Sequence, residues 1–255
     1  MSNIWAALFS IIVIQPWPGV QQDGGMPQPI AEYRCEENAA NTTVADSQGT
    51  WAGTAGINTN FMDFATGKIS ACFDLPSAVQ YNFYSSNATM WDTMPDSYSI
   101  GVWVDWDGVG VADAMWNKTT NYKSDNSATY DLVYLATTTG NKVELAMKIN
   151  NSYNNLVGTT NLGSDWRRVV AVVTPTNRYI YFDGVEEASD SVADRPRDAG
   201  VADCSSRPMI WGGIWVHTGV GIAFDGRIDQ CCVWDVALTP EQVAYDYNGG
   251  AGREY

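Results

Sequence analysis

The fold of this protein is decided by residues 165–190, which read Asp-Trp-Arg-Arg-Val-Val-Ala-Val-Val-Thr-Pro-Thr-Asn-Arg-Tyr-Ile-Tyr-Phe-Asp-Gly-Val-Glu-Glu-Ala-Ser-Asp. β-Branched and aromatic residues fill three short runs, which predict strands at Arg168–Thr174, Arg178–Phe182 and Val185–Ala188. Pro175-Thr176-Asn177 favours a turn between the first two strands, and Asp183-Gly184 is typical of a two-residue hairpin. A meander of this size is not stable alone, so we expect it to lie inside a larger sheet.

Further strands are expected on both sides of this meander. The runs that predict them are Tyr33–Glu36, Ile69–Phe73, Gln80–Ser85, Tyr98–Asp105, Ala128–Ala136, Lys142–Ile149, Met209–Val216, Gly221–Phe224 and Ile228–Trp234. Tyr98–Asp105 alternates most strongly and is expected to be central, whereas residues 38–56 read as a polar loop. One helix is expected to begin at the N-cap Thr239, with Pro240 and Gln242 in its first turn. The pattern predicts an all-β, antiparallel two-sheet sandwich with one short C-terminal helix.

Three parts of the chain also carry a family resemblance. They are the meander (Trp166–Val173 and Tyr179–Val185), the closing stretch (Phe224–Asp229 and Val233–Gln242) and an opening loop (Asn41–Thr50). Together they resemble the laminin-G-like, concanavalin A-like jelly-roll domains. The resemblance implies a jelly-roll domain at residues 30–255, preceded by an apolar arm and linker at residues 1–29. It also implies display, adhesion or carbohydrate binding, because this fold hosts lectins as well as glycoside hydrolases.

Charge and cysteine content restrict the partners and the covalent chemistry. The 255-residue chain has a formal net charge of −15. Such a field repels phosphate backbones and anionic membrane surfaces, so we expect no nucleic-acid partner. Five cysteines leave at least one thiol free in a monomer. Cys204 could form a disulfide with Cys231 or Cys232, or these thiols could stay reduced. Cys231 and Cys232 are expected to face opposite sides of their strand.

The carboxylates do not form the pattern that glycoside hydrolysis needs. That reaction requires two carboxylates about 5–10 Å apart, and the hydrolases that share this fold carry a Glu-x-Asp-x-x-Glu-like strand motif that is missing from this sequence. Glu186 and Glu187 are neighbours on a strand and point to opposite faces, and Glu144 stands alone on its strand. A single histidine, His217, excludes a multi-histidine metal site. The sequence therefore predicts a protein that is not an enzyme.

Two kinds of binding site remain as candidates. Asp105, Asp107 and Asp113 lie around one glycine-containing loop, and clustered carboxylates on turns are what Ca²⁺ prefers. The alternative is that these aspartates only form turns; calcium is possible, and no cofactor is required. Exposed aromatic faces bind sugars, and the candidates for stacking are Trp106, Trp211 and Trp215. The alternative for each tryptophan is a place in the core or in a subunit interface.

The N-terminal arm is apolar from Ile4 to Ile14 and too short to span a bilayer. It carries no Lys or Arg at its start and is followed by a poor cleavage site, which argues against a signal peptide. We expect it to dock on a neighbouring subunit through Ile4, Trp5, Leu8, Phe9, Ile11, Ile12 and Ile14. The alternative is that it folds back on its own domain as an extra strand.

Two functions follow from these features. The first is a structural or adhesion protein of a virion surface (a capsid decoration, head fibre or tail component) that docks by its arm in a homo-oligomer or on another virion protein. The second is a secreted or cell-surface module that binds glycans with calcium. A glycoside hydrolase is a third possibility, and it needs a close pair of carboxylates in a groove.

Overall fold

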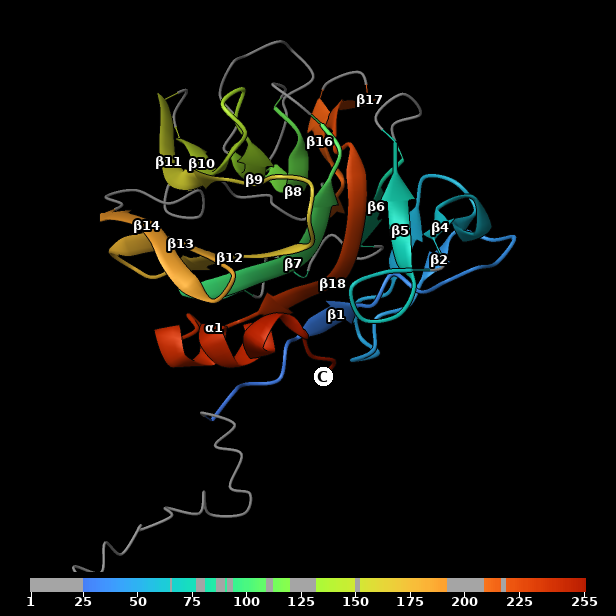
Figure 1. Cartoon of the computed structure of the whole chain (residues 1–255), viewed down its shortest axis with the longest axis horizontal. Coiled ribbons are helices and arrows are strands. Elements are labelled where there is room, and N and C mark those ends of the chain that lie inside the picture. Colours follow the sequence, from blue (N-terminus) through green and yellow to red (C-terminus); the bar gives the residue numbers. More distant parts are fainter. Residues whose placement is uncertain are drawn as a thin grey trace, which may run out of the picture.

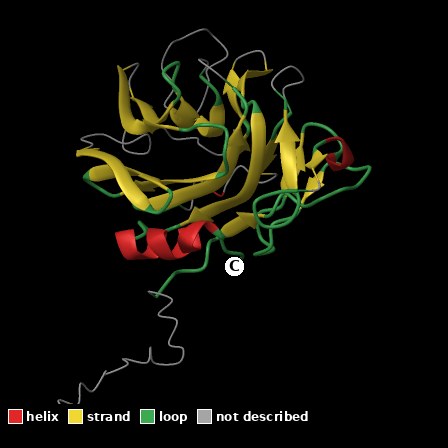
Figure 2. Ribbon diagram, viewed as in Figure 1, coloured by secondary structure: helices red, strands yellow, loops and turns green. Residues whose placement is uncertain are grey.

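The structure is a computed structural model in which residues 25–64, 66–76, 81–85, 90, 94–108, 112–119, 132–149, 152–191, 209–216 and 219–255 are described. Two eight-stranded antiparallel sheets, A and B, lie one above the other and enclose the main apolar core (Figures 1 and 2). One short helix lies near the C-terminus. The predicted all-β two-sheet sandwich with a late helix is therefore confirmed.

Sheet A contains the meander and the closing strand. In spatial order it joins β14 (Val185–Ser191), β13 (Asn177–Phe182), β12 (Arg167–Val173), β7 (Tyr98–Trp106), β18 (Gly226–Trp234), β5 (Cys72–Leu75) and β4 (Asp63–Phe64), and β1 (Ala31–Tyr33) also pairs with β18. All nine residues of β7 are buried, which confirms its central position. Asp183 and Gly184 both have positive φ angles (51° and 81°), as the predicted hairpin between β13 and β14 requires.

Sheet B forms the other half of the sandwich. Its order is β11 (Ser152–Asn161), β10 (Lys142–Ile149), β9 (Leu132–Thr137), β8 (Ala114–Thr119), β15 (Met209–Trp211), β6 (Phe83–Ser85), β3 (Gly53–Ala55) and β2 (Thr43–Val44). The hairpin of β16 (Gly213–Val216) and β17 (Gly219–Ala223) follows β15. Among the described residues the structure also contains the single-turn 3-10 helices η1 (Thr59–Phe61) and η4 (Asn248–Gly250), and the helix α1 (Pro240–Tyr247).

The sequence prediction was wrong for residues 38–56, which contain β2 and β3 and are not a simple loop. Asp46 organises this segment, because its carboxylate accepts four backbone hydrogen bonds, at 2.8–3.0 Å, from the N–H groups of residues 32, 48, 50 and 51. A buried carboxylate with four backbone donors is well satisfied. The turn that it holds brings Gly53–Ala55 back alongside Thr43–Val44.

The outer face of sheet A, which points away from sheet B, is covered by α1. Thr239 caps this helix in the predicted capping box with Gln242, and the left-handed Asn248 ends it. A second apolar cluster lies between helix and sheet, formed by Val170, Val172, Tyr181, Cys232, Trp234, Leu238 and Val243. No helix among the described residues has the length and apolar character needed to cross a membrane.

Residues 25–30 lie on this same outer face. Met26 packs against the second cluster, and the carbonyl of Pro27 accepts a hydrogen bond from Trp234 Nε1 at 3.2 Å. The backbone N–H of Ile30 donates to the carbonyl of Val233 at 2.8 Å. The described end of the predicted linker is therefore attached to sheet A, beside α1 (Figure 1).

Candidate functional site

The outer face of sheet B carries a group of polar and aromatic side chains at its β9–β11 end. Val143, Leu145 and Met147 of β10 point into the core, so Glu144 projects from the opposite face. The register pairs Glu144 with Val157, and Lys148 with Tyr153. We call the resulting surface the platform, and its members are Tyr134, Glu144, Tyr153, Asn155 and Val157.

Glu144 is the polar centre of the platform. Its side chain accepts hydrogen bonds from Tyr134 and from Asn155 Nδ2, the latter at 3.1 Å. The residue is 9% exposed, and burial raises the pKa of its carboxyl above the ordinary value, although both hydrogen bonds lower it. Glu144 is thus a fixed acceptor whose orientation is set by its two neighbours.

Two alanines on the same face of sheet B are buried beside these polar groups, with Ala136 2% exposed and Ala146 0% exposed. Ala136 lies opposite Glu144 in the register, and Ala146 lies between Tyr134 and Asn155. The edge of the platform is open, because Tyr153 is 54% exposed and Val157 is 40% exposed. The exposed Tyr153 beside oriented polar groups suits a ligand that is flat on one side and rich in hydroxyl groups.

The prediction that Trp106 and Trp211 stack on sugars was wrong. Trp106 is 3% exposed and Trp211 is 0% exposed, so neither ring offers a face to a ligand. Trp211 stacks on Phe83 with ring centroids 6.2 Å apart, inside the core between the sheets. Trp106 lies in the same core and donates its indole N–H to Asp113 at 2.7 Å. The side chain of Trp215 lies outside the described residues.

The predicted calcium ligands are engaged by different partners. Asp113 accepts the indole N–H of Trp106, whereas Asp105 pairs with Arg227 across β7 and β18 at 3.2 Å. Asp107 is exposed at the end of β7. Burial raises the pKa values of Asp105 and Asp113. Within the described ranges no three carboxylate, cysteine or histidine side chains are placed to hold a metal ion, so the structure does not assemble the predicted site.

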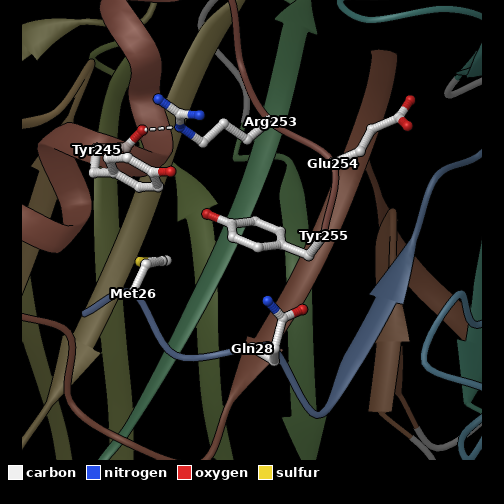
Figure 3. A pocket seen from close by; sticks show the side chains of 6 residues that line it. All are labelled: Met26, Gln28, Tyr245, Arg253, Glu254 and Tyr255. Carbon is white, nitrogen blue, oxygen red and sulfur yellow. Dashed lines mark hydrogen bonds between the residues drawn. The ribbon is translucent and has the colours of Figure 1, made fainter. Parts of the chain in front are cut away.

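A pocket lies on the other side of the molecule, beside α1 and the outer face of sheet A. It has a volume of about 270 Å³ and is lined by Met26, Gln28, Tyr245, Arg253, Glu254 and Tyr255 (Figure 3). The guanidinium of Arg253 lies 3.7 Å from the centroid of the Tyr245 ring and donates to its carbonyl at 2.6 Å. Tyr255 OH donates to Asp246 at 2.8 Å. These contacts are made within the chain, so they attach the C-terminal residues to α1.

Several predicted features lie outside the described residues. They are the arm residues Ile4, Trp5, Leu8, Phe9, Ile11, Ile12 and Ile14, together with His217 and Cys204. The expectation that Cys231 and Cys232 face opposite sides is confirmed, because Cys231 belongs to the main core and Cys232 to the cluster beneath α1. The arm's docking role stays a prediction.

Sequence reasoning missed most of the platform. It read Glu144 as isolated and assigned no strand to Ser152–Asn161, since this segment is rich in Asn and Thr. The segment reads Ser-Tyr-Asn-Asn-Leu-Val-Gly-Thr-Thr-Asn, in which only Leu156 and Gly158 are buried, so its sequence carries no clear apolar alternation.

Residues 80–244 match the sequence model of a family described as the concanavalin A-like lectin/glucanases superfamily. This match covers more than half of the chain, so the protein belongs to that family. It includes the meander and the closing stretch on which the resemblance was based. No curated protein matches the chain.

Solved structures give the same fold at low sequence identity. Domain 4 of AbnA, an extracellular arabinanase from Geobacillus stearothermophilus solved with arabinotriose, is 19% identical, with a TM-score of 0.61 over 85% of this chain and 97% of that chain. The receptor-binding domain of botulinum neurotoxin D is 14% identical, with a TM-score of 0.59 over 87% of this chain. The binding domain of Paraclostridial Mosquitocidal Protein 1 is 14% identical, with a TM-score of 0.57 over 89% of this chain. This chain spans about half the length of each toxin domain, at 52% and 53%.

Proposed function

We propose that this protein is a non-catalytic adhesion module that binds glycans through the platform on sheet B. The observation that carries the proposal is the hydrogen-bonded group of Tyr134, Glu144 and Asn155 beside the exposed ring of Tyr153. Carboxylate and amide groups hold sugar hydroxyls, and an aromatic face covers the C–H side of a pyranose or furanose ring. The arabinotriose complex of the similar arabinanase domain supports a sugar as ligand class.

The charge pattern favours neutral glycans. The protein carries a net charge of −15, and the polar centre of the platform is a carboxylate. An acidic sugar would meet like charge in both the overall field and the contact itself. Neutral oligosaccharides avoid this repulsion, and their hydroxyl groups donate to Glu144.

The arrangement of carboxylates supports binding without hydrolysis. Glu144 is the only Asp or Glu residue in the eight described strands of sheet B. Both retaining and inverting hydrolysis use a pair of carboxylates flanking the scissile bond. The platform thus has one of the two groups, which is enough for a hydrogen bond and insufficient for the usual mechanism.

An extracellular or surface location agrees with this function. The virion-surface role that the sequence favoured stays a prediction, because it depends on the docking of residues 1–29, of which the structure describes only residues 25–29. On a virion or on a cell surface, the adhesion module would attach the particle or protein that bears it to a surface that carries glycans.

The test is binding of the full chain to a panel of neutral and acidic oligosaccharides, including arabino-oligosaccharides, measured by glycan array and then by calorimetry. Tyr153→Ala is expected to lower the affinity for the best neutral ligand by about two- to twelvefold, because an aromatic contact contributes about 0.5–1.5 kcal/mol. Glu144→Gln is expected to weaken it by a similar factor through the lost charged acceptor.

Phe61→Ala is the matched control. Phe61 is 60% exposed in η1, outside the platform, so its loss is expected to leave binding unchanged. The titrations are repeated with Ca²⁺ and with a chelator, and equal affinities are expected. No binding to any neutral glycan, or equal losses in Tyr153→Ala and Phe61→Ala, would overturn the proposal. Release of reducing sugar from a bound oligosaccharide would overturn its non-catalytic part.

A further inference from the structure

Two cysteines that are far apart in the sequence meet in the core. Cys35 follows β1, Cys231 lies on β18, and their sulfur atoms are 4.0 Å apart although 196 positions separate them. Both residues are 0% exposed and belong to the main apolar cluster between the sheets. The antiparallel pairing of β1 with β18, which places Tyr33 opposite Cys231, brings them together.

The local backbone is irregular on both strands at this point. Cys35 and Gln230 are non-glycine residues with positive φ angles of 57° and 47°. The register of β18 against β7 shifts between Asp229 and Cys232, which marks a bulge around Cys231. Such conformations are unfavourable for residues with a Cβ and persist only when the surroundings hold them. A covalent link between the two irregular positions would supply such a restraint.

We propose that Cys35 and Cys231 form an intramolecular disulfide when the chain folds under oxidising conditions. With glutathione disulfide as oxidant, the two thiols lose two protons and two electrons and form one S–S bond, and the glutathione disulfide is reduced to two glutathione thiols. The bond ties β1 to the closing strand and closes a loop of nearly the whole domain, which restricts the unfolded chain strongly. This inference does not depend on the proposed glycan binding.

The other described cysteines are placed differently. Cys72 donates to the carbonyl of Thr66 at 3.8 Å, and Cys232 faces the cluster beneath α1. Burial raises the pKa of the Cys35 thiol well above its ordinary value, so little reactive thiolate is present once the domain has folded. The disulfide is therefore expected to form during folding, and the folded reduced protein is expected to react slowly with the same oxidant.

The experiment is refolding of the full chain in glutathione redox buffer, followed by alkylation of free thiols, trypsin digestion without reduction, and mass mapping. Cleavage after Arg34 and Lys68 gives a peptide, residues 35–68, whose one cysteine is Cys35, and cleavage after Arg227 and Arg253 gives residues 228–253 with Cys231 and Cys232. We expect these two peptides to be joined, with a mass about 2 Da below the sum of the reduced 35–68 peptide and the 228–253 peptide that carries one alkyl group, on Cys232.

Two variants identify which cysteine of the 228–253 peptide is bonded to Cys35. The joined peptide is expected to persist in Cys232→Ala and to disappear in Cys231→Ala. The oxidised wild-type chain is expected to melt at least about 5 °C above the reduced chain, and Cys72→Ser is the control that keeps this difference. Alkylated Cys35 after oxidative refolding, or a link from Cys35 or Cys231 to Cys204, would overturn the proposal. The mapping of the wild-type chain decides the question even if a variant fails to fold.

Discussion

Removing the Asp246 carboxylate is predicted to destabilise the protein strongly, because it leaves Arg168 charged and buried. The two side chains are each 1% exposed and form a bidentate pair, with Arg168 Nε to Asp246 Oδ2 at 2.7 Å and Arg168 Nη2 to Asp246 Oδ1 at 3.0 Å. Arg168 also donates to the carbonyl of Gln230 at 2.7 Å. A Cβ on Gly101 would lie 2.7 Å from Nη2, so a glycine at this position leaves the space that the guanidinium occupies.

The expected loss for Asp246→Ala is about 3–5 kcal/mol of the free energy of unfolding, which is the usual cost of breaking a buried ion pair. The assay is urea unfolding followed by tryptophan fluorescence, with the m-value compared between variants. Glu254→Ala is the matched control, because its ion pair with Arg34 at 3.0 Å is about one-third exposed and is expected to contribute less than about 1 kcal/mol.

A double variant separates the buried charge from the lost packing. Arg168→Met with Asp246→Leu removes both charges and keeps much of the volume, so it is expected to be clearly more stable than Asp246→Ala. A loss below about 1 kcal/mol for Asp246→Ala, or a double variant as unstable as the single one, would contradict this reasoning.

The remaining predictions concern pH and helix capping. Burial raises the pKa of Asp229 from 3.8 to about 6, so the folded state binds the proton more tightly than the unfolded chain. The free energy of unfolding is therefore expected to fall by up to about 3 kcal/mol as the pH rises from about 4 to about 6. The side-chain oxygen of Asp229→Asn can still accept from the backbone N–H groups of Lys68 and Ile69. This variant is expected to reduce the pH dependence of the unfolding free energy, measured by urea unfolding between about pH 4 and about pH 6. An unchanged pH dependence would mean that other groups cause it. Thr239→Ala is expected to cost about 1 kcal/mol by removing the N-cap of α1, and an unchanged urea midpoint would show that α1 does not need its cap.

The features that the sequence predicted correctly depend on neighbours in the chain. The Asp183-Gly184 hairpin needs only residues that accept positive φ angles, and the capping box of Thr239 and Gln242 needs only three-residue spacing. The central place of β7 followed from its apolar alternation. For these elements local propensity and the tertiary fold agree.

The features that were missed or wrong depend on contacts between distant segments. Whether a tryptophan faces solvent is decided by the opposite sheet, and Trp211 is enclosed by Phe83 and Trp116, which come from other strands. The grouping of Glu144 with Tyr134 and Asn155 arises from the pairing of β9, β10 and β11. The contact between Cys35 and Cys231 spans most of the chain, so no spacing rule pointed to it.

Gly25–Ile30 leaves the sandwich on the side of sheet A, whereas the platform lies on the outer face of sheet B. Two packed sheets about 10 Å apart separate the two surfaces. If the protein is anchored on the side of sheet A, as the predicted arm would require, its platform faces away from the anchor. Under the proposed function, copies anchored in a row would present their platforms in one direction, and a polymeric glycan would engage several of them at once. Weak contacts at single platforms would combine into strong attachment by avidity, without any new contact within the domain.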